Sequence, residues 1–228
     1  MPMMQNLKEI EGKIEAACKR VKRDLSEIKI VAVGKTFDAG TLREAYSLGL
    51  RDFGENRVQE MLSKQAQLPS DIDWHMIGRL QTNKVRDILG KTALIHSLDR
   101  KELFAKIDND ARRLKIPSVK CLVQVNISRE ASKAGFLTED LEAFLEDIPH
   151  DSPVKVQGLM TIGPLSEDSA RIRTVFAQAK KLYDHMAARF SKGTWRYLSM
   201  GMSGDYEMAI EEGSTMLRIG TALFGSRS

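Results

Sequence analysis

The sequence predicts an α/β protein that forms one (β/α)8 TIM barrel with an extra helix at its N-terminus. Eight short apolar segments alternate with segments of helical periodicity along the 228 residues. Such alternation is typical of a parallel sheet, and eight repeats favour a closed barrel over an open doubly wound sheet. No GxGxxG or GxxxxGK[ST] motif follows the first strand, so the usual marker of a dinucleotide fold or phosphate loop is missing.

The first elements follow from the spacing of apolar residues. Leu7, Ile10 and Ile14 recur at intervals of three or four residues, which predicts an amphipathic helix over about 4–23. A β-branched run at 28–34 predicts the first strand. The same reasoning predicts helices at 41–49, 56–67, 82–90 and 100–114, and strands at 51–55, 73–78, 93–98 and 118–127.

The second half of the chain continues the pattern. Helices are expected at 138–148 and 167–190, on either side of a strand at 154–163. Two less regular apolar segments, 195–200 and 215–220, flank a short helix at 205–213 and complete the eight strands. We therefore expect a single domain over 1–228, in which residues 1–24 form a helix that packs on the barrel.

Composition argues against several classes of protein. The net charge is only +4, from 35 basic and 31 acidic residues, and aromatic residues make up 6% of the chain, so a nucleic-acid-binding protein is not expected. Cys18 and Cys121 are far apart, and the four histidines lack ligand spacing, so we expect neither a disulfide framework nor a metal site. No stretch approaches the length of a membrane span. We expect a monomeric cytoplasmic protein without a membrane partner.

Polar residues follow most of the predicted strands. In a barrel the chemistry lies where strands end and βα loops begin, so these residues are the candidates for a site. They are Lys35, Glu55 and Asn56, Arg79 to Lys84, Asn126, Ser199 to Ser203, and Gly220 with Thr221.

Lys35 follows the first predicted strand directly. A lysine at this position is most simply a surface residue. At the mouth of an apolar barrel, however, partial loss of water favours the neutral amine, which forms a Schiff base with an aldehyde. The position therefore suits covalent capture of an aldehyde.

The last two predicted strands lead into loops rich in glycine and hydroxyl groups. The segments SMGMSGD (199–205) and RIGTALFG (218–225) suit a phosphate site, because glycine lets backbone N–H groups approach an anion and barrels often hold phosphate in these loops. Ordinary turn chemistry favours the same residues. Arg218 lies inside an apolar strand, where it either pairs with a core carboxylate or donates to the ring nitrogen of pyridoxal phosphate.

Several motifs together resemble a known family. They are VAVGKT (31–36), FGENRVQE (53–60), WHMIGRLQTNK (74–84), VNISREASKAGF (125–136), GLMTIGP (158–164) and LSMGMSGDYEMAIEEGSTMLRIGTALFG (198–225). Through these motifs, which span nearly the whole chain in the family's order, the protein resembles the pyridoxal phosphate homeostasis proteins.

The resemblance implies a fold type III barrel, similar to the N-terminal domain of bacterial alanine racemase, and a role for each candidate residue. Lys35 would form the internal aldimine with pyridoxal 5'-phosphate. The phosphate would lie against Ser199, Gly220 and Thr221 with Ser203 nearby, Arg218 would face the pyridine nitrogen, Asn56 would lie beside the ring, and Met160 would be a packing contact or part of the core.

Two positions depart from the family pattern. Gly34 stands where a serine often precedes the lysine, which puts a hydroxyl contact from that position in doubt. Arg79 stands where the family more usually has the proline of an IGPLQ motif, and it adds a positive charge near the barrel mouth.

The resemblance leaves a carrier and an enzyme as alternatives. A racemase of the alanine type needs a tyrosine from a second domain, for which a chain that ends at Ser228 has no room. An arginine partner also keeps the pyridine nitrogen unprotonated, which weakens the ring as an electron sink. We therefore expect a non-catalytic protein that binds the cofactor, maintains vitamin B6 homeostasis and delivers the cofactor to apoenzymes, with an amino-acid racemase as the alternative. Lys84 is either a solvated lysine at a helix start or a transient second acceptor of the aldehyde.

Overall fold

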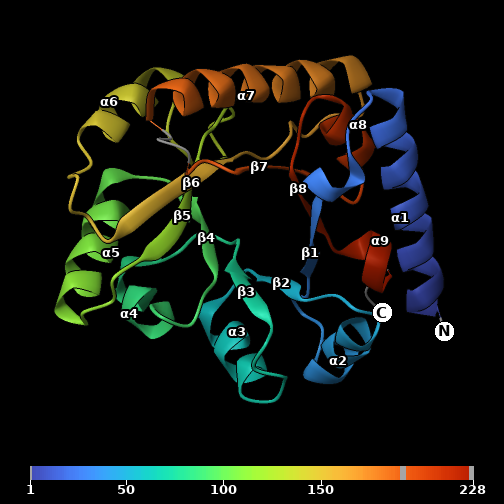
Figure 1. The fold of residues 1–228 in the computed structure, drawn as a ribbon, viewed down its shortest axis with the longest axis horizontal. Coiled ribbons are helices and arrows are strands. Elements are labelled where there is room, and N and C mark those ends of the chain that lie inside the picture. The colour runs from blue at the N-terminus through green and yellow to red at the C-terminus, as the bar shows by residue number, and fades with distance from the viewer. Residues whose placement is uncertain (1, 191–193, 226–228) are drawn as a thin grey trace.

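The computed structural model describes residues 2–190 and 194–225, and its centre is a closed barrel of eight parallel strands (Figure 1). Each strand pairs with the next along the chain, and β8 pairs with β1 to close the sheet. The predicted fold class is confirmed. The strands are β1 (Lys29–Val33), β2 (Asp52–Glu55), β3 (Asp73–Met76), β4 (Leu94–Leu98), β5 (Val119–Gln124), β6 (Val154–Met160), β7 (Tyr197–Met202) and β8 (Met216–Ile219).

Helices surround the barrel in the order that the sequence predicts. They are α1 (Pro2–Arg20), α2 (Ala39–Ser47), α3 (Val58–Gln65), α4 (Val85–Ile88), α5 (Lys101–Arg113), α6 (Leu141–Glu146), α7 (Ser169–Phe190), α8 (Tyr206–Glu211) and α9 (Thr221–Phe224). The helices predicted at 82–90 and 138–148 each begin with a 3-10 turn, η2 (Thr82–Lys84) and η3 (Thr138–Asp140). The sequence pattern did not predict α9 or the 3-10 turn η1 (Leu25–Glu27).

Side chains fill the interior of the barrel, so it is a packed core rather than a pore. Val31, Leu94, Leu122, Met160 and Met216 form an apolar cluster contributed by five different strands. A larger apolar cluster lies between the strands and the surrounding helices. Because strand residues alternate between the two faces, polar residues that share the inner face with the small cluster also lie inside the barrel.

The N-terminal helix covers the region where the chain completes the barrel. Leu7, Ile10 and Ile14 of α1 are buried, as their spacing predicts. The helix packs against α8 and α9, on the right-hand side of the view in Figure 1. It therefore supports the elements that carry the last two βα loops.

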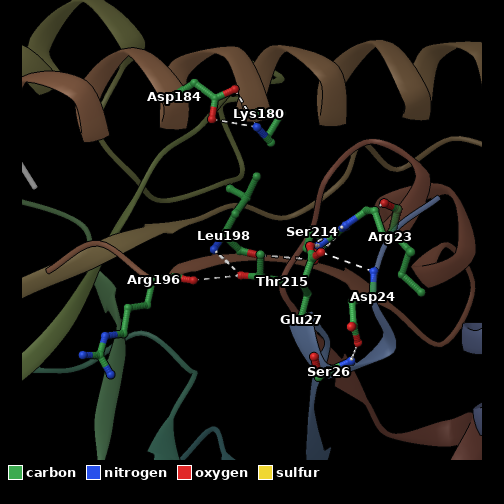
Figure 2. Close-up of polar contacts among 11 residues, drawn as sticks. Arg23, Asp24, Ser26, Glu27, Lys180, Asp184, Arg196, Leu198, Ser214 and Thr215 are labelled. Atoms are coloured by element: carbon green, nitrogen blue, oxygen red, sulfur yellow. Dashed lines mark hydrogen bonds and ion pairs between the residues drawn. The ribbon is translucent and has the colours of Figure 1, made fainter. Parts of the chain in front are cut away.

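Hydrogen bonds anchor the start of β8 at the other end of the barrel (Figure 2). Arg23 Nη1 donates to the carbonyl oxygen of Ser214 at 2.7 Å. The Thr215 hydroxyl oxygen accepts from the backbone N–H of Leu198 at 2.8 Å and lies 3.3 Å from the carbonyl oxygen of Arg196. These contacts tie β8 to β7 and to the segment after α1, and so fix the strand that carries Arg218.

None of the helices within residues 2–190 and 194–225 is long and apolar enough to cross a bilayer. No group of His, Cys, Asp and Glu side chains there is arranged to hold a metal ion.

Candidate functional site

A cavity of about 620 Å³ opens where the strands end. Its lining comes from the loops after several strands, which is the usual position of a site in a barrel. Seven of the eight predicted binding residues line it: Lys35, Asn56, Met160, Ser203, Arg218, Gly220 and Thr221.

The charged side chains around this cavity are all cationic. They are Lys35, Arg79, Lys133 and Arg218, and the described lining contains no Asp or Glu. Outside the lining, Asp99 pairs with Arg79 and Glu130 pairs with Lys133, whereas Lys35 and Arg218 have no ion-pair partner within the described ranges. The cavity therefore keeps a positive field that attracts anions. It suits a small molecule that carries a phosphate group.

Lys35 lies in the turn after β1. Its ammonium group forms no hydrogen bond or ion pair with the described part of the chain. The next residue, Thr36, has a φ of 71°, in the left-handed region that a β-branched residue rarely adopts. The backbone N–H of Thr36 donates to Glu60 Oε2 at 3.2 Å, so the turn is held from α3.

A buried ion pair lies beneath this turn. Lys64 Nζ donates to Glu55 Oε1 at 2.6 Å and to the carbonyl oxygen of Gly34 at 2.9 Å. Glu55 is completely buried, and burial raises the pKa of its carboxyl although Lys64 lies beside it. Glu55 was a candidate site residue from its position after a strand, but the structure places it in this support and not on the cavity wall.

Arg218 lies on the inner face of β8 and is only 5% exposed. Its Nη1 donates to Ser199 Oγ at 2.7 Å, and its Nη2 donates to the carbonyl oxygen of Thr161 at 2.9 Å. It forms no ion pair with the described residues. Burial lowers the pKa of Arg218 to about 10, so the guanidinium keeps its charge at neutral pH.

Ser199 is the predicted residue that does not line the cavity. It is completely buried in the middle of β7, where its hydroxyl contacts Arg218 and lies 3.2 Å from His96 Nδ1. The structure therefore places Ser199 beneath Arg218. Its contact with a phosphate remains a prediction.

The loops after β7 and β8 meet at one side of the cavity. Ser203 Oγ accepts from the backbone N–H groups of Gly220 and Ala222, at 3.2 and 3.1 Å. Thr221 begins α9 directly beside this contact. The hydroxyl and glycine residues predicted from the two sequence segments are thus brought together in space.

Asn56 and Met160 complete the predicted set. The loop that carries Asn56 approaches the loop after β3 so closely that a Cβ atom at Gly78 would lie 2.3 Å from the Asn56 carbonyl oxygen. Met160 is 1% exposed, belongs to the apolar cluster inside the barrel, and also borders the cavity. The two interpretations of Met160, core residue and packing contact, are compatible.

Lys133 lines the cavity and was not predicted. It lies in the loop after β5, where its Nζ donates to the carbonyl oxygen of Gly163 at 2.7 Å and lies 3.0 Å from Glu130 Oε2. Asn126 supports this loop by donating to the carbonyl oxygen of Lys133. The search for polar residues directly after strands selects Asn126, which is buried and supports the loop. The exposed end of the same loop is the part that reaches the cavity.

Lys84 belongs to a neighbouring cavity of about 720 Å³. This second cavity also contains Arg57 and Arg100, and it shares Asn56 and Arg79 with the first. Lys84 and Lys35 therefore do not line the same cavity.

Comparisons with known proteins find the same fold, and the matches cover nearly the whole chain. The family model of the alanine racemase N-terminal domain matches residues 6–228. The chain is 42% identical over 228 residues to the pyridoxal phosphate homeostasis protein of Aquifex aeolicus (strain VF5), a match that covers all of this chain and 99% of the relative.

Two solved structures extend these comparisons. PipY of Synechococcus elongatus PCC7942, solved with pyridoxal phosphate (PLP) bound, has a TM-score of 0.83 and 36% identity, with 98% of this chain and 100% of PipY covered. An alanine racemase of Bartonella henselae with covalently bound PLP has a TM-score of 0.71 over 96% of this chain and 60% of the racemase. The identity to the racemase is 13%, so that likeness concerns the fold alone.

Proposed function

The chain belongs to the family of the alanine racemase N-terminal domain, and we propose that it binds pyridoxal 5'-phosphate covalently through Lys35 and serves vitamin B6 homeostasis. Relatives that match its full length are named pyridoxal phosphate homeostasis proteins, and the related PipY has been solved with PLP. These comparisons support the proposal for this chain.

One observation carries the proposal. The cavity presents a lysine without a hydrogen-bond partner in the described structure, beside three further cations and without a carboxylate in its described lining. When bound, PLP supplies an aldehyde that condenses with a primary amine to give a Schiff base and water. The positive field of the cavity would attract the phosphate of such a ligand, and the amine of Lys35 would react with its aldehyde.

The lining residues have distinct proposed roles. Lys35 holds the cofactor, and the loops that contain Ser203, Gly220 and Thr221 receive its phosphate. Ser199 lies beneath the lining and acts on the cofactor through Arg218. Arg218 donates to the pyridine nitrogen from below, while Asn56 and Met160 bound the ring. Because Arg218 stays charged, this nitrogen remains an acceptor, which favours holding the cofactor over driving proton abstraction.

Two further features belong to the same proposal. We propose that the protein acts in the cytoplasm as a monomer and transfers PLP to apoenzymes. Its cysteines, Cys18 and Cys121, are free and buried, as in proteins of a reducing compartment. The large apolar side chains that are exposed, such as Leu25, Leu114 and Leu165, lie on separate segments of the chain.

The first experiment is an absorption spectrum of the protein loaded with PLP, before and after borohydride reduction. We expect a band near ~420 nm for the protonated Schiff base, and peptide mapping should find the reduced adduct on Lys35. Lys35→Ala should abolish the band, whereas Lys84→Ala, at a lysine of the neighbouring cavity, should retain it. A colourless native protein, or an adduct on another lysine, would contradict the proposal.

Activity assays separate the carrier from an enzyme. The loaded protein should not racemise alanine, and it should restore activity to an apoenzyme faster than the Lys35→Ala protein mixed with the same amount of PLP. Light scattering on the purified protein should give the mass of one chain. Turnover of alanine by the native protein and not by Lys35→Ala would identify a racemase instead.

A further inference from the structure

A continuous chain of polar side chains crosses the barrel interior beneath the candidate site. It starts at Arg218, whose Nη1 donates to Ser199 Oγ. Ser199 Oγ lies 3.2 Å from His96 Nδ1, and His96 Nε2 lies 2.9 Å from His75 Nδ1. His75 Nε2 then lies 2.9 Å from Asp52 Oδ1. Every contact in this interior chain is within hydrogen-bond distance.

The two ends of the interior chain lie at opposite ends of the barrel. Arg218 borders the cavity near the end of β8. Asp52 is the first residue of β2, and its Oδ1 also accepts from Lys29 Nζ at 2.8 Å, at the start of β1. The Lys29 side chain is 35% exposed. The interior chain of polar side chains therefore connects the cavity to the opposite end of the barrel, which faces solvent.

Asp52 determines which atom donates and which accepts in each hydrogen bond of the interior chain. Burial alone would raise the pKa of Asp52, but hydrogen bonds from His75 and Lys29 hold that pKa below its ordinary value. The carboxylate is thus an acceptor only, so His75 must carry a proton on Nε2. In the tautomer that carries this proton alone, His75 accepts at Nδ1 from His96 Nε2–H.

The protonation of His96 in turn determines the orientation of the Ser199 hydroxyl at the site. It is completely buried, and burial, together with His75 and Arg218, holds its pKa well below the ordinary value. A neutral His96 that is protonated on Nε2 accepts at Nδ1, and the hydroxyl of Ser199 is the donor there. The Ser199 oxygen is then left to accept from Arg218. Each donor in the chain points from Arg218 towards Asp52.

We propose that Asp52, His75 and His96 are positioning residues that fix the orientation of the Ser199 hydroxyl and, through it, of the Arg218 guanidinium. This inference rests on the proposed function, since Arg218 is the group that meets the cofactor ring. A buried arginine with a single anchor at Thr161 would keep rotational freedom about its side chain, and the second anchor at Ser199 removes it. The hydrogen bonds that begin at Asp52, at the end of the barrel opposite the cavity, thus preorganise Arg218 in the site.

The test begins with the native protein without PLP. Long-range 1H–15N NMR distinguishes the two nitrogens of each imidazole ring, and we expect both His75 and His96 to be protonated on Nε2 only. Protonation of His96 on Nδ1 would reverse the direction of the interior chain and overturn the proposal. This measurement needs no substitution and no cofactor.

The second measurement compares Asp52→Ala with Asp73→Ala, which removes an exposed carboxylate from the neighbouring first position of β3. Asp52→Ala should populate the Nδ1–H form of His96 and weaken PLP binding about tenfold, the size of one lost hydrogen bond to a charged group. Asp73→Ala should change neither. Unchanged His96 protonation in Asp52→Ala, or a changed protonation with unchanged PLP affinity, would refute the positioning role. A native protein that binds no PLP at all would instead refute the proposed function, and the NMR result would still stand.

Discussion

At the scale of single residues, the turn that carries Lys35 depends on the buried ion pair of Glu55 and Lys64. The Lys64 side chain is 8% exposed and that of Glu55 is fully buried, and Glu55 Oε2 has no hydrogen-bond partner in the described structure. Replacing such a pair by apolar residues is often tolerated, but removing one partner leaves a charge uncompensated. The pair is therefore a sensitive point beneath the site.

We predict that Lys64→Met lowers the free energy of unfolding by about 3–5 kcal/mol at pH 7. It removes both the ion pair and the hydrogen bond to the Gly34 carbonyl oxygen. Urea denaturation followed by circular dichroism measures the loss. The double variant Lys64→Met/Glu55→Gln is the matched control and should recover part of it, because no charge is then left buried.

The pH dependence of this loss has a definite sign. The folded-state pKa of Glu55 is raised, so the stability linked to this carboxyl is fully present below its unfolded pKa and is lost as pH rises through the folded pKa. Without Lys64 the carboxyl takes up a proton still more readily. The deficit of Lys64→Met should therefore shrink on acidification, and a deficit that grows would contradict this account.

At the scale of secondary structure elements, two glycines show how backbone geometry decides a substitution. Gly158 in β6 has a φ of 141°, and a Cβ atom there would lie 1.9 Å from the Tyr197 carbonyl oxygen of β7. A Cβ atom at Gly12 in α1 would have no atom within 4 Å apart from its chain neighbours and the backbone of its own helix. The first glycine lets two paired strands approach each other, whereas the second only weakens a helix.

We predict opposite effects of Gly158→Ala and Gly12→Ala. Gly158→Ala should destabilise the protein by more than about 3 kcal/mol, because the strands must separate locally. Gly12→Ala should stabilise it by about 0.5–1 kcal/mol through helix propensity. Thermal unfolding of the two variants beside the native protein measures both, and a Gly158→Ala protein as stable as the native one would show that β6 and β7 can adjust.

Periodicity predicted long elements better than short ones. The helices that became α1, α5 and α7 contain enough turns for an apolar face to be visible in the sequence. α9 has four residues, which is too few for a periodic signal. β7 also runs two residues beyond its predicted end at 200. The strand boundary is where the sequence was least informative.

At the scale of the whole molecule, barrel closure explains why most of the candidate site could be predicted. Parallel strands bring all their C-terminal ends to one face, so Lys35, Asn56 and Gly220 meet although they are far apart in sequence. The exceptions have local causes. Ser199 lies inside β7, as it does inside the predicted strand 195–200, and so one layer below the cavity. Lys133 reaches the cavity from a loop whose path has no periodic signal.

Closure also buries polar groups whose titration affects the entire fold. His96 has a folded-state pKa well below its ordinary value, whereas in the unfolded chain it titrates near roughly 6.5. The unfolded state therefore binds the proton first as pH falls. The stability contributed by a neutral His96 is fully present above the unfolded pKa and is lost progressively below it.

We predict that the free energy of unfolding falls between pH 7 and pH 5, with a slope that approaches about 1.4 kcal/mol per pH unit from this histidine alone. His96→Gln should be less stable at pH 7 and should show a flatter pH profile. His150→Gln, the same substitution at an exposed histidine, should keep the native profile. Urea denaturation across this range tests the account, and parallel profiles of the native and His96→Gln proteins would mean that the buried imidazole does not couple barrel stability to pH.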